Sequence, residues 1–287
     1  MAKRAVYGIL LALLLPVAGY FILKGSTKEA VTMPRHFFPD SVVTTTKNGK
    51  TISDTAWHTL PDFQLKNQLG KDVSWKDLQI KNDDNTTEGK IVVANFFFTN
   101  CPTICPTLTI AMRDLQQGIK RPEKVGNRDA DFIHFLSFSI DPARDSVPRL
   151  KSWADRFGVN PQNWWLLTGD RKQIYNLSYN EMKLMMVDGG NVDSNFIHTD
   201  MFVLIDKYRT VRGYYHMLKF EGRNKWTIDT AALSALSKDI ILLTLEKDRK
   251  KKSFLSGKLE LLAVVFTLAA ALIILLFVYL KKENRRL

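Results

Sequence analysis

The sequence is poor in cysteine, with two in 287 residues, Cys101 and Cys105. A disulfide-stabilised scaffold needs more cysteines, spread along the chain, and is therefore excluded. Internal repeats and low-complexity tracts are also missing, and a composition of 45% hydrophobic and 24% charged residues is globular, which excludes a disordered chain. The two cysteines need a local explanation, as a redox couple or as metal ligands.

The charge is strongly unbalanced, with a formal net charge of +12. We expect no nucleic-acid partner, because no nucleic-acid-binding motif accompanies this charge. Much of the excess flanks two apolar runs, where basic side chains meet lipid headgroups, so membrane lipid is an expected partner. These flanking residues are Lys3, Arg4, Lys250, Lys251, Lys252, Lys258, Lys281, Lys282, Arg285 and Arg286.

Two apolar runs are long enough to span a bilayer. The run from Ala5 to Leu23 resembles a signal peptide, but Val17-Ala18-Gly19 is a poor cleavage site, and we favour a retained anchor. The run from Leu259 to Leu280 is the clearer span, and its single acidic residue, Glu260, stands at the entrance.

Two spans place both termini on one side of the membrane and the central part of the chain on the other. The basic termini predict a cytoplasmic location for both ends, in a bacterial cytoplasmic membrane, with the central domain extracytoplasmic or periplasmic. The basic cluster at 249–252 argues against this orientation, but a long domain translocates largely regardless of its charge. The predicted segments are an anchor at 1–25, a linker and hairpin leader at 26–57, a domain at 58–248, a basic linker at 249–258, and a span with its tail at 259–287.

The chain between the spans alternates strands and helices after an Asn48-Gly49 hairpin signal. This alternation predicts an α/β fold with a mainly parallel sheet and helices on both faces. Strands are expected at 91–98, 132–140 and 164–168, and a hairpin of two strands is expected at 201–205 and 210–215. Helices are expected at 102–117, 148–157, 171–182 and 230–245.

The cysteines lie where the predicted strand 91–98 passes into the predicted helix 102–117. Residues i and i+4 share one helix face, so both sulfurs point to one centre. Cys101 at the helix N-terminus favours thiolate, and Pro102 suits the first helical position. Two thiolates select Cu(I), and an added imidazole also suits Cu(II). The spacing leans toward metal, but two inert cysteines or thiol–disulfide exchange are alternatives.

Three motifs together resemble the Sco/SenC family of copper chaperones, over residues 60–245. They are Cys101-Pro-Thr-Ile-Cys105-Pro, the loop Asp141-Pro-Ala-Arg-Asp145, and His198 before the apolar strand 201–205. The resemblance implies a thioredoxin-like domain with a copper ion, Cu(I) or Cu(II), held by Cys101, Cys105 and His198. It also implies a role in delivering copper to the dinuclear copper centre of cytochrome c oxidase subunit II, or in keeping the cysteines of that centre reduced.

Other candidate ligands have ordinary structural explanations. We expect Asp141 and Asp145 to serve structural or docking roles, and Met182, Met185 and Met186 to form a helix face that enters the core. The remaining histidines are expected to be structural or solvent-facing: His134 as a hydrogen-bonded strand residue, His216 on the surface, and His36 and His58 in the leader.

We therefore expect a metallochaperone and not a turnover enzyme. The main alternative is a membrane-anchored thiol–disulfide oxidoreductase that uses Cys101 and Cys105 and does not need His198. A peroxidase is disfavoured, because Phe98 stands where a peroxiredoxin has a threonine that orients the peroxide. Expected partners are subunit II and, in addition, other copper chaperones or thioredoxin-like reductases.

Overall fold

The computed structural model of the chain describes residues 32–47, 50–81, 87–119, 132–184, 199–222 and 225–246. Within Met33–Leu245 these residues belong to one compact unit. None of the helices in the described ranges has the length and apolar character that a membrane crossing requires. Both predicted spans, at 5–23 and 259–280, lie outside those ranges.

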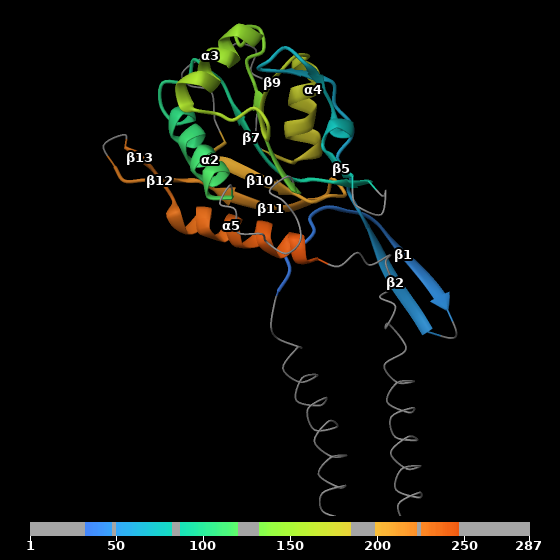
Figure 1. Cartoon of the computed structure of the whole chain (residues 1–287). Coiled ribbons are helices and arrows are strands. Elements are labelled where there is room, and N and C mark those ends of the chain that lie inside the picture. The colour runs from blue at the N-terminus through green and yellow to red at the C-terminus, as the bar shows by residue number, and fades with distance from the viewer. Residues whose placement is uncertain are drawn as a thin grey trace, which may run out of the picture. The chain divides into compact units, whose positions relative to one another are not determined.

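A seven-stranded sheet forms the centre of this unit, in the order β11-β10-β7-β8-β9-β3-β4 (Figure 1). The strands are β3 (Leu65–Asn67), β4 (Asp72–Val73), β7 (Ile91–Phe97), β8 (Ile133–Ser139), β9 (Trp164–Thr168), β10 (Met201–Ile205) and β11 (Val211–His216). Only the β7–β8 and β8–β9 pairs are parallel. The sheet is therefore mixed, and the prediction of a mainly parallel sheet is wrong. The short connections β3–β4 and β10–β11 allow only antiparallel pairing, since a parallel pair needs a long crossover.

Three two-stranded ribbons surround this sheet. They are β1 (Pro39–Lys47) with β2 (Lys50–Trp57), β5 (Gln79–Lys81) with β6 (Thr87–Gly89), and β12 (Leu218–Phe220) with β13 (Trp226–Ile228). The predicted leader hairpin is confirmed, with Lys47 paired opposite Lys50.

The helices cover both faces, with α2, α3 and α5 on one side of the central strands and α4 on the other (Figure 1). They are α2 (Cys105–Ile119), α3 (Val147–Phe157), α4 (Arg171–Asn176) and α5 (Thr230–Leu245), with a 3₁₀ turn at Trp75–Asp77. The predicted helix 171–182 is divided, because α4 passes into a π-helical turn at Leu177–Glu181. Gly158 ends α3 in the left-handed conformation with φ 68°, as its position in the sequence indicates.

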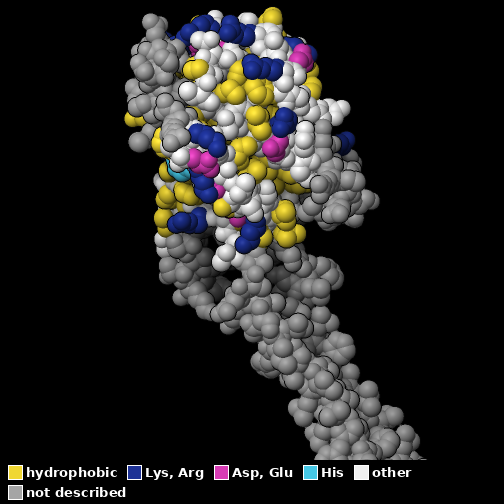
Figure 2. Space-filling model, turned by 90° about the vertical axis from the view of Figure 1, so that its left-hand side faces the viewer, with side chains coloured by type: hydrophobic (Ala, Val, Ile, Leu, Met, Phe, Trp, Pro, Cys, Tyr) yellow, Lys and Arg dark blue, Asp and Glu magenta, His cyan; other side chains and the backbone are white. Residues whose placement is uncertain are grey.

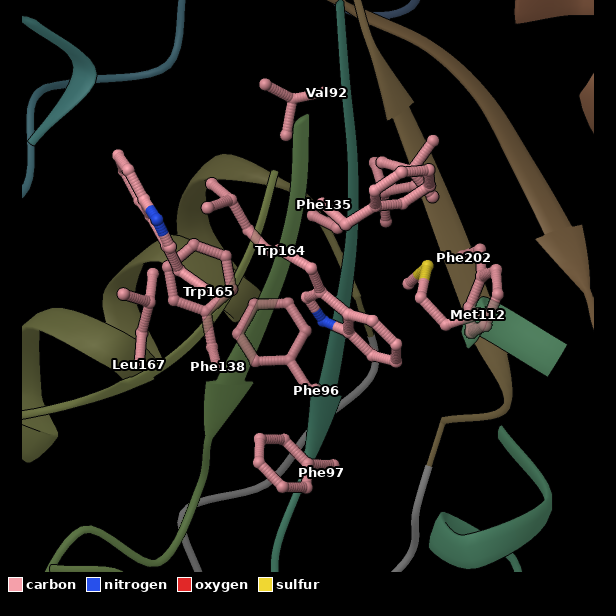
Figure 3. Close-up of a cluster of buried hydrophobic side chains, with 14 of the residues drawn as sticks. Val92, Phe96, Phe97, Met112, Phe135, Phe138, Trp164, Trp165, Leu167 and Phe202 are labelled. Carbon is pink, nitrogen blue, oxygen red and sulfur yellow. The ribbon is translucent and has the colours of Figure 1, made fainter. Parts of the chain in front are cut away.

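The core is rich in aromatic side chains, which gather around β7 and β8 (Figure 3). Phe96 and Phe138 stack across these two strands with ring centroids 5.2 Å apart, and Phe63 meets Phe138 edge-on. Every residue of β7 and β8 is buried, as expected for strands covered on both faces. Met182 is fully buried in this core, as predicted, while Met185 and Met186 lie outside the described residues.

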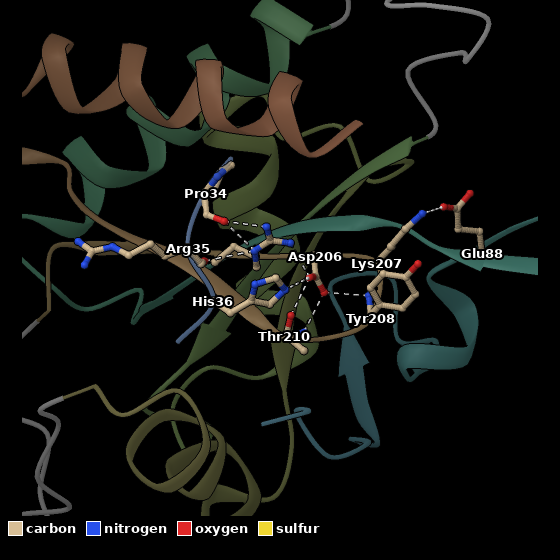
Figure 4. Close-up of polar contacts among 9 residues, drawn as sticks. Pro34, Arg35, His36, Glu88, Asp206, Lys207, Tyr208 and Thr210 are labelled. Atoms are coloured by element: carbon tan, nitrogen blue, oxygen red, sulfur yellow. Dashed lines mark hydrogen bonds and ion pairs between the residues drawn. The ribbon is translucent and has the colours of Figure 1, made fainter. Parts of the chain in front are cut away.

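A buried ion pair fixes the segment that leads into β1 (Figure 4). The Arg212 guanidinium lies 3.0 Å from Asp206 and also donates to the backbone carbonyls of Pro34 and Arg35. Asp206 further accepts the Thr210 hydroxyl at 2.6 Å. Because both charges are buried and well hydrogen-bonded, loss of either partner would leave an uncompensated charge in the interior.

His134 in β8 differs from its prediction as a hydrogen-bonded residue. It is 1% exposed, its ring packs edge-on against Trp165 at 4.1 Å, and neither ring nitrogen has a hydrogen-bond partner among the described residues. Burial, aided by the positive charge of Lys90, lowers the pKa of His134 to about 3. The ring is therefore neutral in the folded protein at physiological pH.

The folded protein should lose stability in mild acid because of His134. Below an ordinary histidine pKa of about 6.5 the unfolded chain takes up a proton that the folded ring refuses, which costs about 1.4 kcal/mol per pH unit. Urea unfolding of the full chain at pH 7 and pH 5 measures the free energy of unfolding. Between these two pH values, the His134→Leu variant should lose about 2 kcal/mol less of this free energy than the wild type. His216→Leu, at an exposed histidine, is the control. Equal acid loss in wild type and His134→Leu would contradict the assignment.

Candidate dithiol site

The two cysteines lie in and just after the connection between β7 and α2. Helix α2 begins at Cys105, and Cys101 lies in the preceding turn, where its N–H donates to the Phe98 carbonyl at 3.3 Å. The prediction that Cys101 opens the helix is wrong. Pro106 lacks an N–H and fits the first helical turn, so the helix starts around this second proline and not at Pro102.

The turn nevertheless brings the cysteines together. The backbone N–H of Cys105 donates to the Cys101 sulfur across 3.4 Å, so this sulfur caps the N-terminus of α2. Both cysteines are thiols and not disulfide-bonded, with side chains 4% and 1% exposed. A hydrogen bond with Cys101 and burial together raise the pKa of the Cys105 thiol well above its ordinary range, and the negative charge of Asp145 adds to this. Cys105 is therefore a protonated thiol at neutral pH.

A buried carboxylate, Asp145, is hydrogen-bonded to the chain that leads into this turn. Asp145 is fully buried in the loop between β8 and α3, and it accepts the Thr99 N–H at 3.1 Å and the Thr99 hydroxyl at 2.5 Å. It also accepts the Ser139 hydroxyl at 2.6 Å. Three donors suit an ionised carboxylate, which can only accept hydrogen bonds. Asp145 thus fixes the chain two residues after Phe97 and two residues before Cys101.

Two arginines close the outer side of this network. Arg149 donates to the Thr99 hydroxyl at 2.8 Å, which leaves that hydroxyl's proton for Asp145. Arg144 forms an ion pair with Asp141 at 2.6 Å, and the Asp141 carbonyl accepts the N–H groups of Arg144 and Asp145. The carboxylates of the Asp-Pro-x-x-Asp loop are therefore engaged in structural bonds, as predicted.

The predicted third ligand, His198, lies outside the described residues. The described chain resumes at Thr199, and β10 follows from Met201. Because β10 runs antiparallel to β7, Met201 lies at the end of the sheet where β7 finishes at Phe97. Figure 3 shows the start of β10 at the same end of the core as Phe97. Among the described residues, no group of three or more His, Cys, Asp or Glu side chains could hold a metal ion.

Three residues of this site were not predicted to act on it: Thr99, Ser139 and Arg149. The Asp-Pro-x-x-Asp loop indicated that Asp145 follows a core strand. It did not indicate that the carboxylate would turn back toward Thr99, since this contact joins residues 46 positions apart. Two further histidines have acidic partners: His216 is exposed at the end of β11, opposite Met201 and 2.8 Å from Asp200, and His58 lies between Asp40 and Glu181.

A dithiol at the junction between a central parallel strand and its helix, in a mixed α/β domain, is the arrangement of a thioredoxin-like fold. The family comparison agrees: the SCO1/SenC family model matches residues 53–230, and the chain belongs to this family.

Individual relatives extend this finding. The SCO1 protein homolog of Bacillus subtilis is 32% identical over 158 residues, which cover 55% of this chain and 73% of the relative. A SCO1/SenC family lipoprotein from Bacillus anthracis is 32% identical, with a TM-score of 0.51 over 65% of this chain and 95% of that one. BsSco, described as a cytochrome c oxidase assembly protein with a disulfide switch, is 28% identical, with a TM-score of 0.49 over 66% and 95%. Sco structures with copper bound are among the solved matches.

Removing the charge of Asp145 should lower the pKa of Cys105 toward its ordinary value. Asp145→Asn should also cost about 1–3 kcal/mol of stability, because a buried acceptor that faces hydroxyl and amide donors is lost. A pH titration of thiolate absorbance in the reduced chain measures the first effect, and urea unfolding measures the second. Asp155→Asn, at an exposed ion pair with Lys151, should change neither. An unchanged Cys105 titration in Asp145→Asn would show that the carboxylate does not act on the thiol.

Proposed function

We propose that this protein is a copper-binding assembly factor for cytochrome c oxidase, and that copper is its cargo. The observation that carries the proposal is the dithiol itself: two buried thiols that are hydrogen-bonded to one another, with the Cys105 N–H 3.4 Å from the Cys101 sulfur at the N-terminus of α2. Thiolates are soft ligands that select Cu(I), and family membership points to the same metal. Binding must displace the proton that Cys105 holds, so copper uptake weakens in acid.

His198 is the proposed third ligand of this cargo. Its support is positional, because it stands three residues before Met201, which begins β10 at the end of the sheet where β7 leads to Cys101. A ligand in a loop can close onto the two sulfurs and open again to release copper. An imidazole added to two thiolates also suits Cu(II).

The proposed client is subunit II of cytochrome c oxidase. The protein would deliver copper to the dinuclear centre of that subunit or reduce the cysteines of that centre. Both acts use the same dithiol, and the hydrogen bond between the two thiols is compatible with either one. Other copper chaperones and thioredoxin-like reductases are proposed as further partners, to load copper or electrons onto the dithiol.

We also propose that the domain works on the outer side of a bacterial cytoplasmic membrane. The support lies in the sequence: apolar runs at 5–23 and 259–280 have the length of bilayer spans, and basic residues stand at both termini. An extracytoplasmic domain would meet a copper centre that is assembled outside the cytoplasm.

The full chain, purified in detergent, should bind one copper ion with sulfur and nitrogen ligands. His198→Ala should lower the Cu(II) affinity about tenfold or more, equivalent to about 1.4 kcal/mol, and leave the dithiol titration intact. X-ray absorption spectra and copper competition titrations of the two proteins provide the measurement. His216→Ala, an exposed histidine at the end of β11, is the matched control and should retain wild-type affinity.

Two outcomes would redirect the assignment. Copper surrounded by oxygen and nitrogen only would end the metal hypothesis. Full affinity in His198→Ala, together with reduction of a subunit II disulfide by the copper-free dithiol, would favour a thiol–disulfide oxidoreductase.

A further inference from the structure

The β12–β13 ribbon carries two exposed aromatic side chains that the dithiol chemistry does not use. Phe220 is 57% exposed and Trp226 is 40% exposed. They form a direct cross-strand pair with ring centroids 5.0 Å apart. Such a pair stabilises a ribbon by only a few tenths of a kcal/mol to about 1 kcal/mol, while it leaves two large apolar surfaces in water.

The described residues of the ribbon are hydrogen-bonded both at its root and beside its turn. At its root, the Met217 N–H donates to the Asp200 carbonyl at 3.1 Å, and the Asp229 N–H donates to the Met217 carbonyl at 2.8 Å. At its tip, Gly222 has φ 82° and closes the turn with the Lys225 N–H. The aromatic pair is therefore presented by an ordered element and loses little conformational freedom on binding.

This ribbon begins at the same end of the sheet as the dithiol. Met217 contacts Asp200, which immediately precedes β10, and β10 pairs with β7, the strand that leads to Cys101. The two strand spacings from β7 to β11 amount to about 10 Å, and the three residues from Met217 to Phe220 add at most about 10 Å. The ribbon also packs against α2, the helix that Cys105 opens.

The distance matters because the sulfurs are buried. With Cys101 4% exposed and Cys105 1% exposed, a client can reach them only by pressing its surface against this end of the sheet. A standard interface covers about 800 Å² on each partner, which is a patch about 30 Å across. One such patch spans both the dithiol and the aromatic pair.

The surroundings of the pair favour a protein over a lipid surface. Both lysines among the described residues of the ribbon are paired, because Lys219 lies 3.7 Å from Asp229 and Lys225 lies 3.2 Å from Glu221, while Arg223 of the turn lies outside the described residues. A lipid-binding surface carries an unpaired basic excess, whereas a protein interface has an aromatic centre within a balanced polar rim. Figure 2 views the side on which Figure 1 draws β12 and β13, and hydrophobic side chains gather in a band down this face between scattered basic ones.

We propose that Phe220 and Trp226 form the docking surface for the client protein whose thiols or copper centre the dithiol serves. This inference rests on the proposed function in cytochrome c oxidase assembly. It adds the surface through which the protein would bind its client. The client is expected to present an apolar pocket beside its cysteines, since aromatic side chains that fill such pockets dominate binding energy.

The test measures the affinity of the detergent-solubilised full chain for the fluorescently labelled copper-binding domain of subunit II, by thermophoresis. Phe220→Thr with Trp226→Thr should weaken binding about tenfold or more. Threonine pairs are compatible with a β-ribbon, and circular dichroism and the urea midpoint report whether the fold is kept. The single variants supply a second measurement if the double variant does not fold. Tyr179→Thr with Tyr208→Thr removes two comparably exposed aromatics outside the ribbon and should leave the affinity unchanged.

Copper stoichiometry and the dithiol titration of the ribbon variants should equal those of wild type, which separates docking from chemistry. Wild-type affinity in the folded ribbon variants, with copper binding intact, would overturn the docking surface and leave the proposed function standing. No binding of subunit II by wild-type protein would overturn the proposed client and, with it, the docking role. A further test reconstitutes the protein in vesicles that contain brominated lipid, which quenches tryptophan fluorescence. If the wild type is quenched and Trp226→Phe removes this quenching, the pair lies against lipid and the proposal is overturned.

Discussion

The structure around the dithiol depends on one buried carboxylate. Asp145 accepts two hydrogen bonds from Thr99 and one from Ser139, and through them it joins the end of β7 to the end of β8. These bonds attach the turn that carries Cys101 to the neighbouring strand. The pKa of Cys105 is raised mainly by its hydrogen bond with Cys101 and by burial, and the charge of Asp145 adds to them, so the side chain that positions the turn also contributes to the protonation of Cys105.

The spacing of the two cysteines correctly predicts that Cys101 and Cys105 lie close together, but the structural reason for this prediction is wrong. The four-residue separation was attributed to one face of a helix, whereas the structure places Cys101 in a turn and Cys105 at the first helical residue. Pro106 indicates that the helix begins near Cys105, because proline is tolerated in the first turn of a helix and not further along it. The Asp145 contacts could not be predicted, since they depend on how the loop after β8 packs against a strand that is remote in sequence.

The sheet shows the same division between local and tertiary information. Strands β7, β8 and β9 were expected from their apolar runs, and α5 lies at its expected residues. The antiparallel β10–β11 pair was expected as a hairpin, whereas the antiparallel β7–β10 and β3–β9 pairs join strands remote in sequence, whose direction the apolar pattern does not encode. His134 illustrates the limit most sharply, because a histidine among apolar strand residues indicates burial but not whether its nitrogens find partners. That outcome depends on Trp165, which comes from a neighbouring strand.

The match to the SCO1/SenC family covers the whole dithiol site and the β12–β13 ribbon, but it excludes β1 and nearly all of α5. An isolated two-stranded ribbon is marginally stable in water, so β1–β2 depends on contacts with the domain. Arg212 supplies them before β1 by holding the carbonyls of Pro34 and Arg35, and His58 supplies them after β2 by contacting Glu181. The β1–β2 ribbon, which lies largely outside the family match, is thus fastened to elements within it, while the two thiols are buried where β7 leads into α2. In such an arrangement the chemistry is buried and recognition must come from the surrounding surface.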